Sequence, residues 1–217
     1  MRNRSENQIK LVLIRHGATW ANKEHRYLGK TDEALSQEGK DALLAYKAAD
    51  CYPDISQLFI SPMRRCVETA EMLYPNLQPV VIAEWMEMDF GAFEYKNHID
   101  LQGDKRYQDW IDSNGTLPFP EGESREAFIC RCKCGFEKML KERSQEAETI
   151  GMIAHGGTIM ALLSTYLGGE YFDYQTVNGK GYICTLQEVC DEPKQSGELK
   201  QTEHGKSKWK FTDLQKI

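Results

Sequence analysis

Short runs of branched aliphatic residues alternate along this chain with longer segments whose apolar positions recur every three or four residues. The short runs are typical of buried strands, and the longer segments are typical of amphipathic helices. Strands are predicted at 10–14, 58–60, 80–82, 149–154 and 182–186, and helices at 36–49, 62–73, 124–143 and 158–166. Because the strands are separated by helices, we expect an α/β fold whose sheet is built from parallel crossovers.

Two stretches break this alternation. Glycines, prolines and aromatic residues are concentrated at 88–123, which predicts an irregular excursion over one end of the sheet. The segment 190–208 is polar and predicts a loop before a last apolar segment at 209–214. With no repeat and no long linker, the 217 residues are expected to form one domain, 1–217.

Charge and composition exclude several classes of function. The net charge of −6 argues against nonspecific binding to nucleic acid, so an anionic ligand needs a local cluster of positive groups. The first ten residues lack the apolar core of a secretory signal, and no apolar run reaches membrane-spanning length. We therefore expect a cytoplasmic protein that binds neither nucleic acid nor membrane. The sequence leaves open whether it forms a homodimer.

Seven cysteines without a regular spacing favour free thiols over a disulfide framework. Cys130, Cys132 and Cys134 lie close together, but their spacing differs from that of usual zinc sites. Cys132 falls on the apolar stripe of the helix at 124–143, which favours packing over metal binding for the group.

Two histidines follow predicted strands in the same way. The strand at 10–14 runs into Arg15-His16-Gly17, and the strand at 149–154 runs into His155-Gly156-Gly157. Ligands of open α/β folds bind at the carboxyl ends of the strands, and glycine lets the backbone approach a ligand closely. A single histidine in such a turn is more often structural. If the two strands are neighbours, however, the imidazoles face each other, and this pairing favours a functional site.

A third charged segment begins at Ser61, directly after a predicted strand. Ser61 is a candidate N-cap and Pro62 a candidate first residue of the next helix, whose free N–H groups would attract phosphate. Arg64 has Glu68 four residues on and is explained as a solvated ion pair, whereas Arg65 has a threonine there. The pattern favours Arg65 for a phosphate pocket, with solvation of both arginines as the alternative.

Five segments, in order, complete a recognisable pattern. They read Arg15-His16-Gly17-x-Thr19-x-x-Asn22, Arg26 to Asp32 with Leu35-Ser36-x-x-Gly39, Ser61-Pro62-Met63-x-Arg65-x-x-x-Thr69-Ala70, Glu87-x-x-Phe90-Gly91-x-Phe93-Glu94 and Ile153-Ala154-His155-Gly156-Gly157. Over about residues 10 to 186 this pattern resembles the histidine phosphatase superfamily, which includes cofactor-dependent phosphoglycerate mutases and α-ribazole-5′-phosphate phosphatases. A lone Arg-His-Gly is weak, but five matches in order make the resemblance specific.

The resemblance implies a fold and a site. The fold is a phosphoglycerate-mutase-like three-layer α/β/α sandwich with a mostly parallel central sheet. The implied catalytic set is His16 as nucleophile and Glu87 as acid, with His155, Arg15 and Arg65. The implied substrate-binding set is Arg15, Asn22, Gly29, Arg65, His155 and Gly156. No metal ion or other cofactor is implied, and the expected partner is a small-molecule phosphomonoester.

The chemistry of phosphoryl transfer suits these residue types. Two arginines can bind a phosphate dianion through charged hydrogen bonds worth roughly 1.5 to 3 kcal/mol each. His16 must attack through a neutral nitrogen, so its other nitrogen needs an acceptor, for which a backbone carbonyl in its own Gly17 turn is the candidate. Burial would keep Glu87 protonated until the leaving oxygen needs its proton. On sequence alone Glu84, Asp89 and Glu94 compete for this role; the resemblance, through the family's spacing from Gly91, implies Glu87, with Asp89 second.

Two departures from the family pattern, and the region between Glu87 and His155, refine the expected function. Tyr95 stands where many members have glycine and Cys66 where alanine is common, and neither is expected to touch the chemistry. The region between Glu87 and His155 is shorter than in the mutases, which argues against mutase activity. Residues 87–91 and 120–124 resemble the α-ribazole-5′-phosphate phosphatases most, so the resemblance implies such an enzyme or a phosphatase of broad specificity. A mutase and a non-catalytic phosphate-binding protein are the alternatives. Two explanations stay open for the aromatic residues of the excursion: they contact the substrate, or they form a small core beneath the loop. These residues are Phe90, Phe93, Tyr95, Tyr107, Trp110 and Phe119.

Overall fold

A six-stranded mixed sheet forms the centre of the molecule in a computed structural model, which describes residues 8–189 and 208–217. The strand order is β3-β2-β4-β1-β5-β6. β1 to β4 run parallel, β5 lies antiparallel to β1, and β6 lies antiparallel to β5. The bounds are β1 Gln8–Arg15, β2 Gln57–Ile60, β3 Val80–Val81, β4 Thr149–Ala154, β5 Gly181–Val189 and β6 Lys208–Lys216. The predicted α/β fold with a mostly parallel sheet is confirmed.

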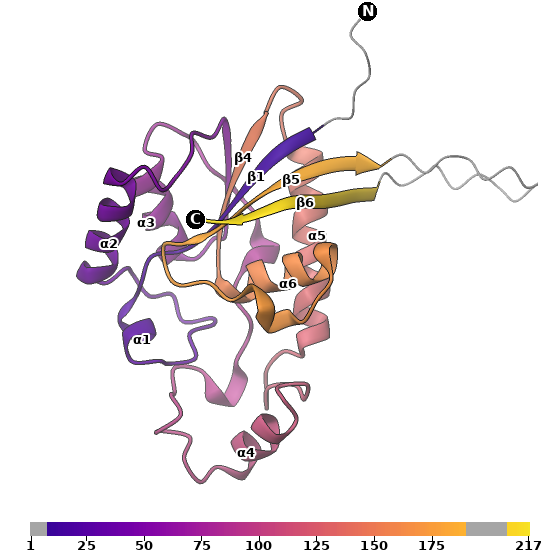
Figure 1. The fold of residues 1–217 in the computed structure, drawn as a ribbon. Helices are drawn as coiled ribbons and strands as arrows, with labels where there is room; N and C mark the ends of the chain where they lie inside the picture. The colour runs from indigo at the N-terminus through magenta and orange to yellow at the C-terminus, as the bar shows by residue number, and fades with distance from the viewer. Residues whose placement is uncertain (1–7, 190–207) are drawn as a thin grey trace, which may run out of the picture.

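Helices cover both faces of this sheet (Figure 1). α2 and α3 lie on one face, and α5 and α6 lie on the other, so that the fold has three layers. The bounds are α1 Trp20–Lys23, α2 Gln37–Ala48, α3 Arg64–Leu73, α4 Lys105–Asp112, α5 Arg125–Glu142 and α6 Gly156–Leu167. Three short 3-10 helices are η1 Ala83–Trp85, η2 Gly91–Phe93 and η3 Tyr171–Tyr174.

The alternation of side chains along β1 divides the core between the two layers of helices. Leu11 and Leu13 pack into the cluster that contains Phe128 of α5, whereas Val12 and Ile14 pack into the cluster that contains Leu43 of α2. All four β1 side chains are fully buried. A strand segment covered on both faces needs an apolar residue at every position, which is why the central residues 11–14 of β1 are all aliphatic.

Two helices begin at residues other than those predicted. α3 begins at Arg64 with Met63 as its N-cap, so Ser61 and Pro62 lie outside the helix. The backbone N–H of Arg64 donates to Asp32 Oδ1 at 2.7 Å, which shows that a carboxylate from another segment caps this helix. The prediction that free N–H groups at the start of this helix attract phosphate is therefore wrong for the N–H of Arg64, which already donates to Asp32. α6 begins at Gly156 rather than at residue 158, with His155 as its N-cap.

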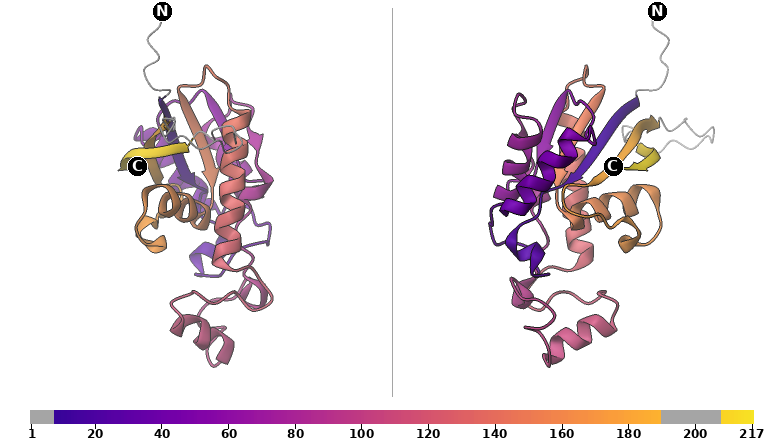
Figure 2. Two further views of the ribbon diagram at one scale, coloured as in Figure 1. Left: turned by 90° about the vertical axis from the view of Figure 1, so that its right-hand side faces the viewer. Right: turned by 60° about the vertical axis from the view of Figure 1, so that its left-hand side comes forward.

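The predicted excursion stands apart from the sheet at one end of the molecule (Figure 2). It contains one regular helix, α4, which the sequence pattern did not predict. Tyr27 and the aromatic side chains of the excursion pack on one another with ring centroids 4.8 to 6.5 Å apart. The predicted polar segment 190–208 falls almost wholly outside the described residues, while the apolar segment at 209–214 forms the centre of β6.

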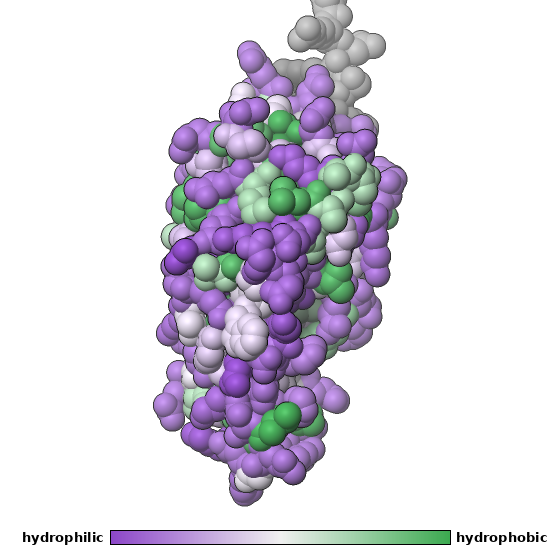
Figure 3. Space-filling view, turned by 90° about the vertical axis from the view of Figure 1, so that its left-hand side faces the viewer, coloured by the Kyte–Doolittle hydropathy of each residue, from purple (hydrophilic) through white to green (hydrophobic). Residues whose placement is uncertain are grey.

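The outer side of the molecule on the flank of α2 is mostly hydrophilic, with separate apolar areas (Figure 3). Within the described part of the chain, no helix has the length and the apolar character needed to cross a membrane.

Candidate active site

The two strand-end histidines lie side by side because β1 and β4 are neighbours. Arg15 is paired with Ala154 at the end of the parallel register, so His16 and His155 each follow the last paired residue. Their ring centroids are 5.1 Å apart with planes at 66°. Both rings are buried, with 3% and 0% of their surface exposed. The prediction that the two imidazoles face each other is confirmed.

One hydrogen bond fixes the tautomer of His16. Nδ1 lies 2.7 Å from the Gly17 carbonyl oxygen, which can only accept, so Nδ1 carries the proton and Nε2 keeps its lone pair. Burial, followed by the charges of Arg65 and Arg15, holds the pKa of His16 well below its usual range. The turn itself is held by Asn178, whose side-chain amide donates to the His16 and Gly17 carbonyls at 3.1 and 3.4 Å. His16 is therefore neutral and has one unprotonated nitrogen.

Arg65 is wholly buried and does not lie on the wall of the main cavity. Its Nε donates to His155 Nδ1 at 3.3 Å, and its two Nη groups donate to the carbonyls of Thr31 and Gly29 at 3.0 Å each. Arg64, by contrast, is exposed and pairs with Glu68, as predicted. Gly29 does not line the cavity, because its carbonyl holds Arg65 instead.

Both ring nitrogens of His155 are engaged. Since Arg65 Nε must donate to Nδ1, the proton lies on Nε2, which donates to Ser61 Oγ at 2.7 Å. Burial, then the charge of Arg65, lowers the pKa of His155 well below its usual range. Ser61, expected to cap a helix, thus binds the second histidine. In this structure His155 positions Arg65 and has no free donor of its own.

Cys66 corrects a prediction. The thiol was expected to stay clear of the chemistry, but Cys66 Sγ lies 3.7 Å from His155 Nε2 and is wholly buried. The contact arises because Cys66 follows Arg65 on α3, on the side that faces the strand end. Burial raises the pKa of this thiol to about 12, so it stays protonated. In α5, Cys132 is buried in the core as predicted, while Cys130 and Cys134 are exposed.

Of the four candidate acids, Glu87 alone lines the main cavity. Its Oε1 accepts from the Met88 N–H at 2.9 Å, and its Oε2 accepts from the Gly157 N–H at 3.4 Å. Burial raises its pKa against these bonds and against the positive charges of Arg65 and Arg15. The alternatives have other partners: Glu84 pairs with Lys138, Asp89 with Lys30, and Glu94 accepts from the backbone of Gly29 and Thr31.

Arg15 supplies an unused donor. Its Nη1 donates to the Thr176 carbonyl at 2.7 Å, while its Nε is buried without a hydrogen-bond partner in the described structure. Its guanidinium lies against Gly156 at the start of α6. Asn22 lines the cavity beside it, and the Asn22 side-chain oxygen accepts from Asn178 at 3.0 Å. A buried donor without a partner is costly, which makes Arg15 Nε a natural contact for an anion.

A cavity of about 670 Å³ is lined by Arg15, Asn22, Glu87 and Gly156, whereas His16, Arg65 and His155 are not among its lining residues. Among the described residues on its wall, Glu87 is the one carboxylate, and the arginines are Arg15, Arg26 and Arg125. Its apolar wall is formed by Tyr27, Met88, Phe90, Trp110, Leu117, Phe119, Met160, Tyr171, Phe172 and Val177. The volume greatly exceeds that of a phosphate group, so a ligand bound here has room for a bulky organic part.

The aromatic side chains of the excursion take both of the roles considered. Phe90, Trp110 and Phe119 line the cavity, whereas Phe93 is fully buried behind them and Tyr107 packs against it. Tyr95 lies away from the cavity, and its hydroxyl donates to Glu33 at 2.8 Å. Its φ of 60° is in the left-handed region, which accounts for the glycine that many related sequences have there.

Several residues at the site lie outside the patterns read from the sequence. Thr176 and Asn178 come from the segment between η3 and β5, and Arg125 and Tyr171 come from α5 and η3. The sequence carries no local signal for Thr176 and Asn178, because their contacts with Arg15 and His16 join residues 161 and 162 positions apart.

A neutral histidine, two arginines and a carboxyl with a raised pKa thus lie together at one end of an α/β sheet, an arrangement suited to binding an anion such as phosphate. The model of the histidine phosphatase superfamily (branch 1) matches residues 11–192, so the chain belongs to this superfamily.

Similar proteins fall into two groups by activity. A 2,3-bisphosphoglycerate-dependent phosphoglycerate mutase of Bifidobacterium longum is 27% identical over 187 residues, which cover 71% of this chain and 75% of that protein. The crystal structure of the α-ribazole phosphatase from Shigella flexneri matches with a TM-score of 0.68 at 24% identity, over 85% of this chain and 92% of that one. The mycobacterial glucosyl-3-phosphoglycerate phosphatase matches with a TM-score of 0.66 at 23% identity, over 83% and 91%. At these identities the structural matches establish the fold.

Proposed function

We propose that the protein is a metal-independent phosphomonoester hydrolase that works through a phosphohistidine on His16. The observation that carries this proposal is the hydrogen bond from His16 Nδ1 to the Gly17 carbonyl, which leaves Nε2 free and unprotonated. A protein that only binds phosphate needs neither a nucleophile nor a protonated acid beside it, and Glu87 supplies the acid.

The positive groups of the site would bind the phosphate. Arg15 Nε lacks a partner in the described structure and is the first donor available to the phosphate oxygens. The Nη groups of Arg65 each keep a second hydrogen beyond those given to Thr31 and Gly29. Gly156 and Gly157 add the N-terminus of α6, whose amides and dipole favour an anion. These contacts would strengthen as charge spreads over the equatorial oxygens in the transition state.

The reaction would proceed in two balanced steps. First, His16 Nε2 forms a bond to phosphorus as the bond to the leaving oxygen breaks, and Glu87 gives its proton to that oxygen. Second, the Glu87 carboxylate takes a proton from a water whose oxygen attacks the phosphorus, which releases phosphate and restores His16. The raised pKa of Glu87 suits both steps, because the group is protonated before the first and basic before the second.

The substrate would carry an apolar or aromatic group next to its phosphate. The cavity has an aromatic wall with Phe90 and Trp110, and it has room beyond the phosphate site. α-Ribazole 5′-phosphate fits this description, as do many phosphomonoesters accepted by an enzyme of broad specificity. A panel of α-ribazole phosphate, sugar phosphates, nucleotides and 3-phosphoglycerate would rank these classes by kcat/KM.

The central test is the labelled intermediate. Enzyme incubated with a labelled phosphomonoester and quenched should carry acid-labile, base-stable label on His16. We expect His16→Ala to remain folded and to lose at least about a thousandfold in turnover of p-nitrophenyl phosphate. Retained turnover in this variant would rule out the nucleophile assignment.

Mutase activity is the second candidate, because curated relatives at 27% identity are phosphoglycerate mutases. A mutase must retain a bisphosphate intermediate, whereas a hydrolase admits water to the phosphohistidine. Incubation with 3-phosphoglycerate, with and without 2,3-bisphosphoglycerate, separates the two. We expect release of inorganic phosphate, and net formation of 2-phosphoglycerate would favour the mutase.

A further inference from the structure

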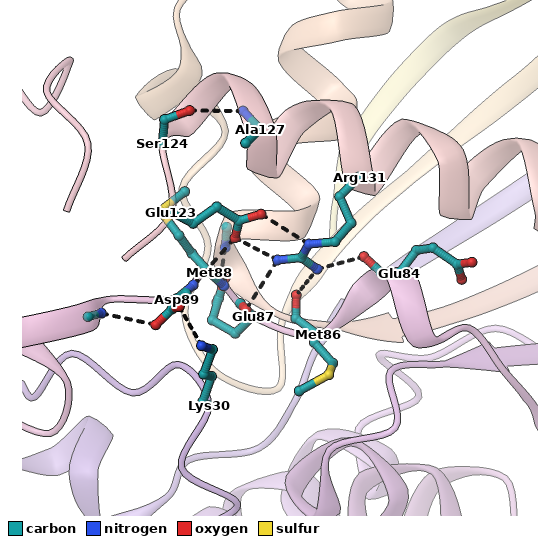
Figure 4. A network of polar contacts seen from close by, with 12 residues as sticks. Lys30, Glu84, Met86, Glu87, Met88, Asp89, Glu123, Ser124, Ala127 and Arg131 are labelled. Carbon is teal, nitrogen blue, oxygen red and sulfur yellow. Dashed lines mark hydrogen bonds and ion pairs between the residues drawn. The ribbon is translucent and has the colours of Figure 1, made fainter. Parts of the chain in front are cut away.

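One arginine of α5 holds the segment on which Glu87 stands. Arg131 Nη1 donates to the carbonyl oxygens of Glu84 and Met86 at 2.8 Å each, and Nη2 approaches the Glu87 carbonyl at 3.4 Å (Figure 4). Between η1 and η2 this segment has no regular secondary structure of its own. A single guanidinium therefore donates hydrogen bonds to three carbonyl oxygens within the four residues 84–87.

The carboxylate of Glu123 aligns this guanidinium. Its two oxygens accept from Arg131 Nε at 3.1 Å and from Nη2 at 2.7 Å, in the paired geometry that holds an arginine most firmly. Glu123 also binds the far side of the same segment, since its backbone N–H donates to the Asp89 carbonyl at 2.9 Å. Asp89 forms an ion pair with Lys30 (Figure 4). The backbone is thus held on both sides of Glu87.

The Glu87 carboxyl itself has few bonds that could fix its position. It accepts from its neighbour Met88 and, at 3.4 Å, from Gly157, and within the described residues no side chain donates to it. Glu87 also lines a second cavity of about 500 Å³, which Arg131 and Glu123 line as well. Glu87 therefore lies between the two cavities. With few bonds of its own, its carboxyl group takes a position that is set by the position of the Glu87 backbone.

We propose that Arg131, aligned by Glu123, is a positioning residue that fixes the backbone of Glu87 and so aims its carboxyl at the leaving oxygen. The proposal rests on the acid role given to Glu87 in the proposed function. Without the guanidinium, three carbonyls lose their donor and the second cavity offers room for the segment to shift. Arg131 is absent from the wall of the main cavity, so it acts through Glu87.

The signature of a misplaced acid is selectivity for the leaving group. A general acid contributes about 10²- to 10⁴-fold where the leaving oxygen needs a proton and much less where it leaves readily as an anion. Benzyl phosphate and p-nitrophenyl phosphate are similar in shape and differ in this respect. Their kcat/KM values report the phosphoryl transfer to His16 and exclude the later hydrolysis.

The experiment compares variants of the full chain on this pair of substrates. We expect Arg131→Met to lower kcat/KM for benzyl phosphate by about tenfold or more, and that for p-nitrophenyl phosphate by less than about threefold. Arg131→Lys, which keeps the charge but not the fork, should restore part of the loss. Glu87→Gln serves as the reference for complete loss of the acid, with the same selectivity and a larger effect.

Lys138→Met is the matched control. Lys138 is also a cation of α5 directed at the same segment, but it pairs with the Glu84 carboxylate at 3.5 Å rather than with the carbonyls that Arg131 holds. Its loss should leave both substrates unchanged. Thermal unfolding of every variant verifies the fold, and if Arg131→Met does not fold, Arg131→Lys and Glu123→Gln carry the comparison.

An equal loss for both substrates, or no loss, would overturn the role of Arg131. If Glu87→Gln is selective for the leaving group and Arg131→Met is not, this proposal alone fails. If the native enzyme hydrolyses neither substrate and forms no phosphohistidine, the proposed function fails instead.

Discussion

Replacing Gly157 with alanine tests the placement of Glu87 by steric contact alone. A Cβ at this position would lie 2.5 Å from Glu87 Oε1, whereas ordinary contacts begin at 3.4 Å, so the carboxyl must move by about 0.9 Å. A displacement of about 1 Å from the productive geometry costs on the order of a hundredfold in rate, or about 2.7 kcal/mol. The same Cβ would lie 3.2 Å from the ring of Phe128, which is a smaller overlap, so the main displacement falls on the end of the Glu87 side chain and the native fold should survive.

The assay measures kcat/KM for benzyl phosphate and the midpoint of thermal unfolding. We expect a loss of about a hundredfold with a midpoint close to that of the native protein. Gly156→Ala is the comparison, since its Cβ would lie 3.4 Å or more from the nearest atoms, those of Arg15. It should lose less, and equally for benzyl and p-nitrophenyl phosphate, because Arg15 is proposed to bind the phosphate that both share. Full activity of Gly157→Ala would refute this placement of the acid.

Three further predictions concern pH, thiols and metal ions. The lowered pKa values of His16 and His155 make the folded protein less stable as the pH falls below 6.5, whereas the raised pKa of Glu87 contributes stability that is lost as the pH rises from 4.5 through its folded value. Glu87→Gln removes the opposing contribution, so the free energy of unfolding in urea between pH 4.5 and 6.5 should rise more steeply with pH, by at most about 1.4 kcal/mol per pH unit, and an unchanged slope would contradict a raised pKa of Glu87. Iodoacetamide should label the exposed Cys130 and spare the buried Cys66 in the native protein, with phosphatase activity retained; peptide mapping by mass spectrometry that finds label on Cys66 would contradict its burial. Excess chelator should leave hydrolysis of p-nitrophenyl phosphate unchanged, since arginines supply the positive charge, and lost activity would contradict the metal-free mechanism.

The parts of the fold that the sequence predicted well are those set by local pattern. The aliphatic run of β1 is continuous because both faces are covered, and the bounds of β4 agree with the predicted strand at 149–154. The choice of Arg65 over Arg64 also rested on local spacing, because only Arg64 has an acid one helical turn away.

The parts that it missed depend on partners distant in the chain. The start of α3 was misplaced because its capping carboxylate, Asp32, lies thirty-two residues before the amide that it binds. The contact of Cys66 with His155 joins residues eighty-nine positions apart. The hydrogen bonds from Arg131 to three backbone carbonyls cannot be predicted from the sequence pattern either, because every residue type has the same backbone carbonyl.

The parallel register of β1 and β4 makes activity a measure of correct folding. Arg15 pairs with Ala154, and the two histidines follow directly. A slip of one residue would move one imidazole about 3.3 Å along the other and turn each side chain of the slipped strand to the opposite face. A misregistered sheet would thus separate the two imidazoles and lose the arrangement of the site. Turnover per molecule therefore counts the fraction of chains whose two central strands have met in register.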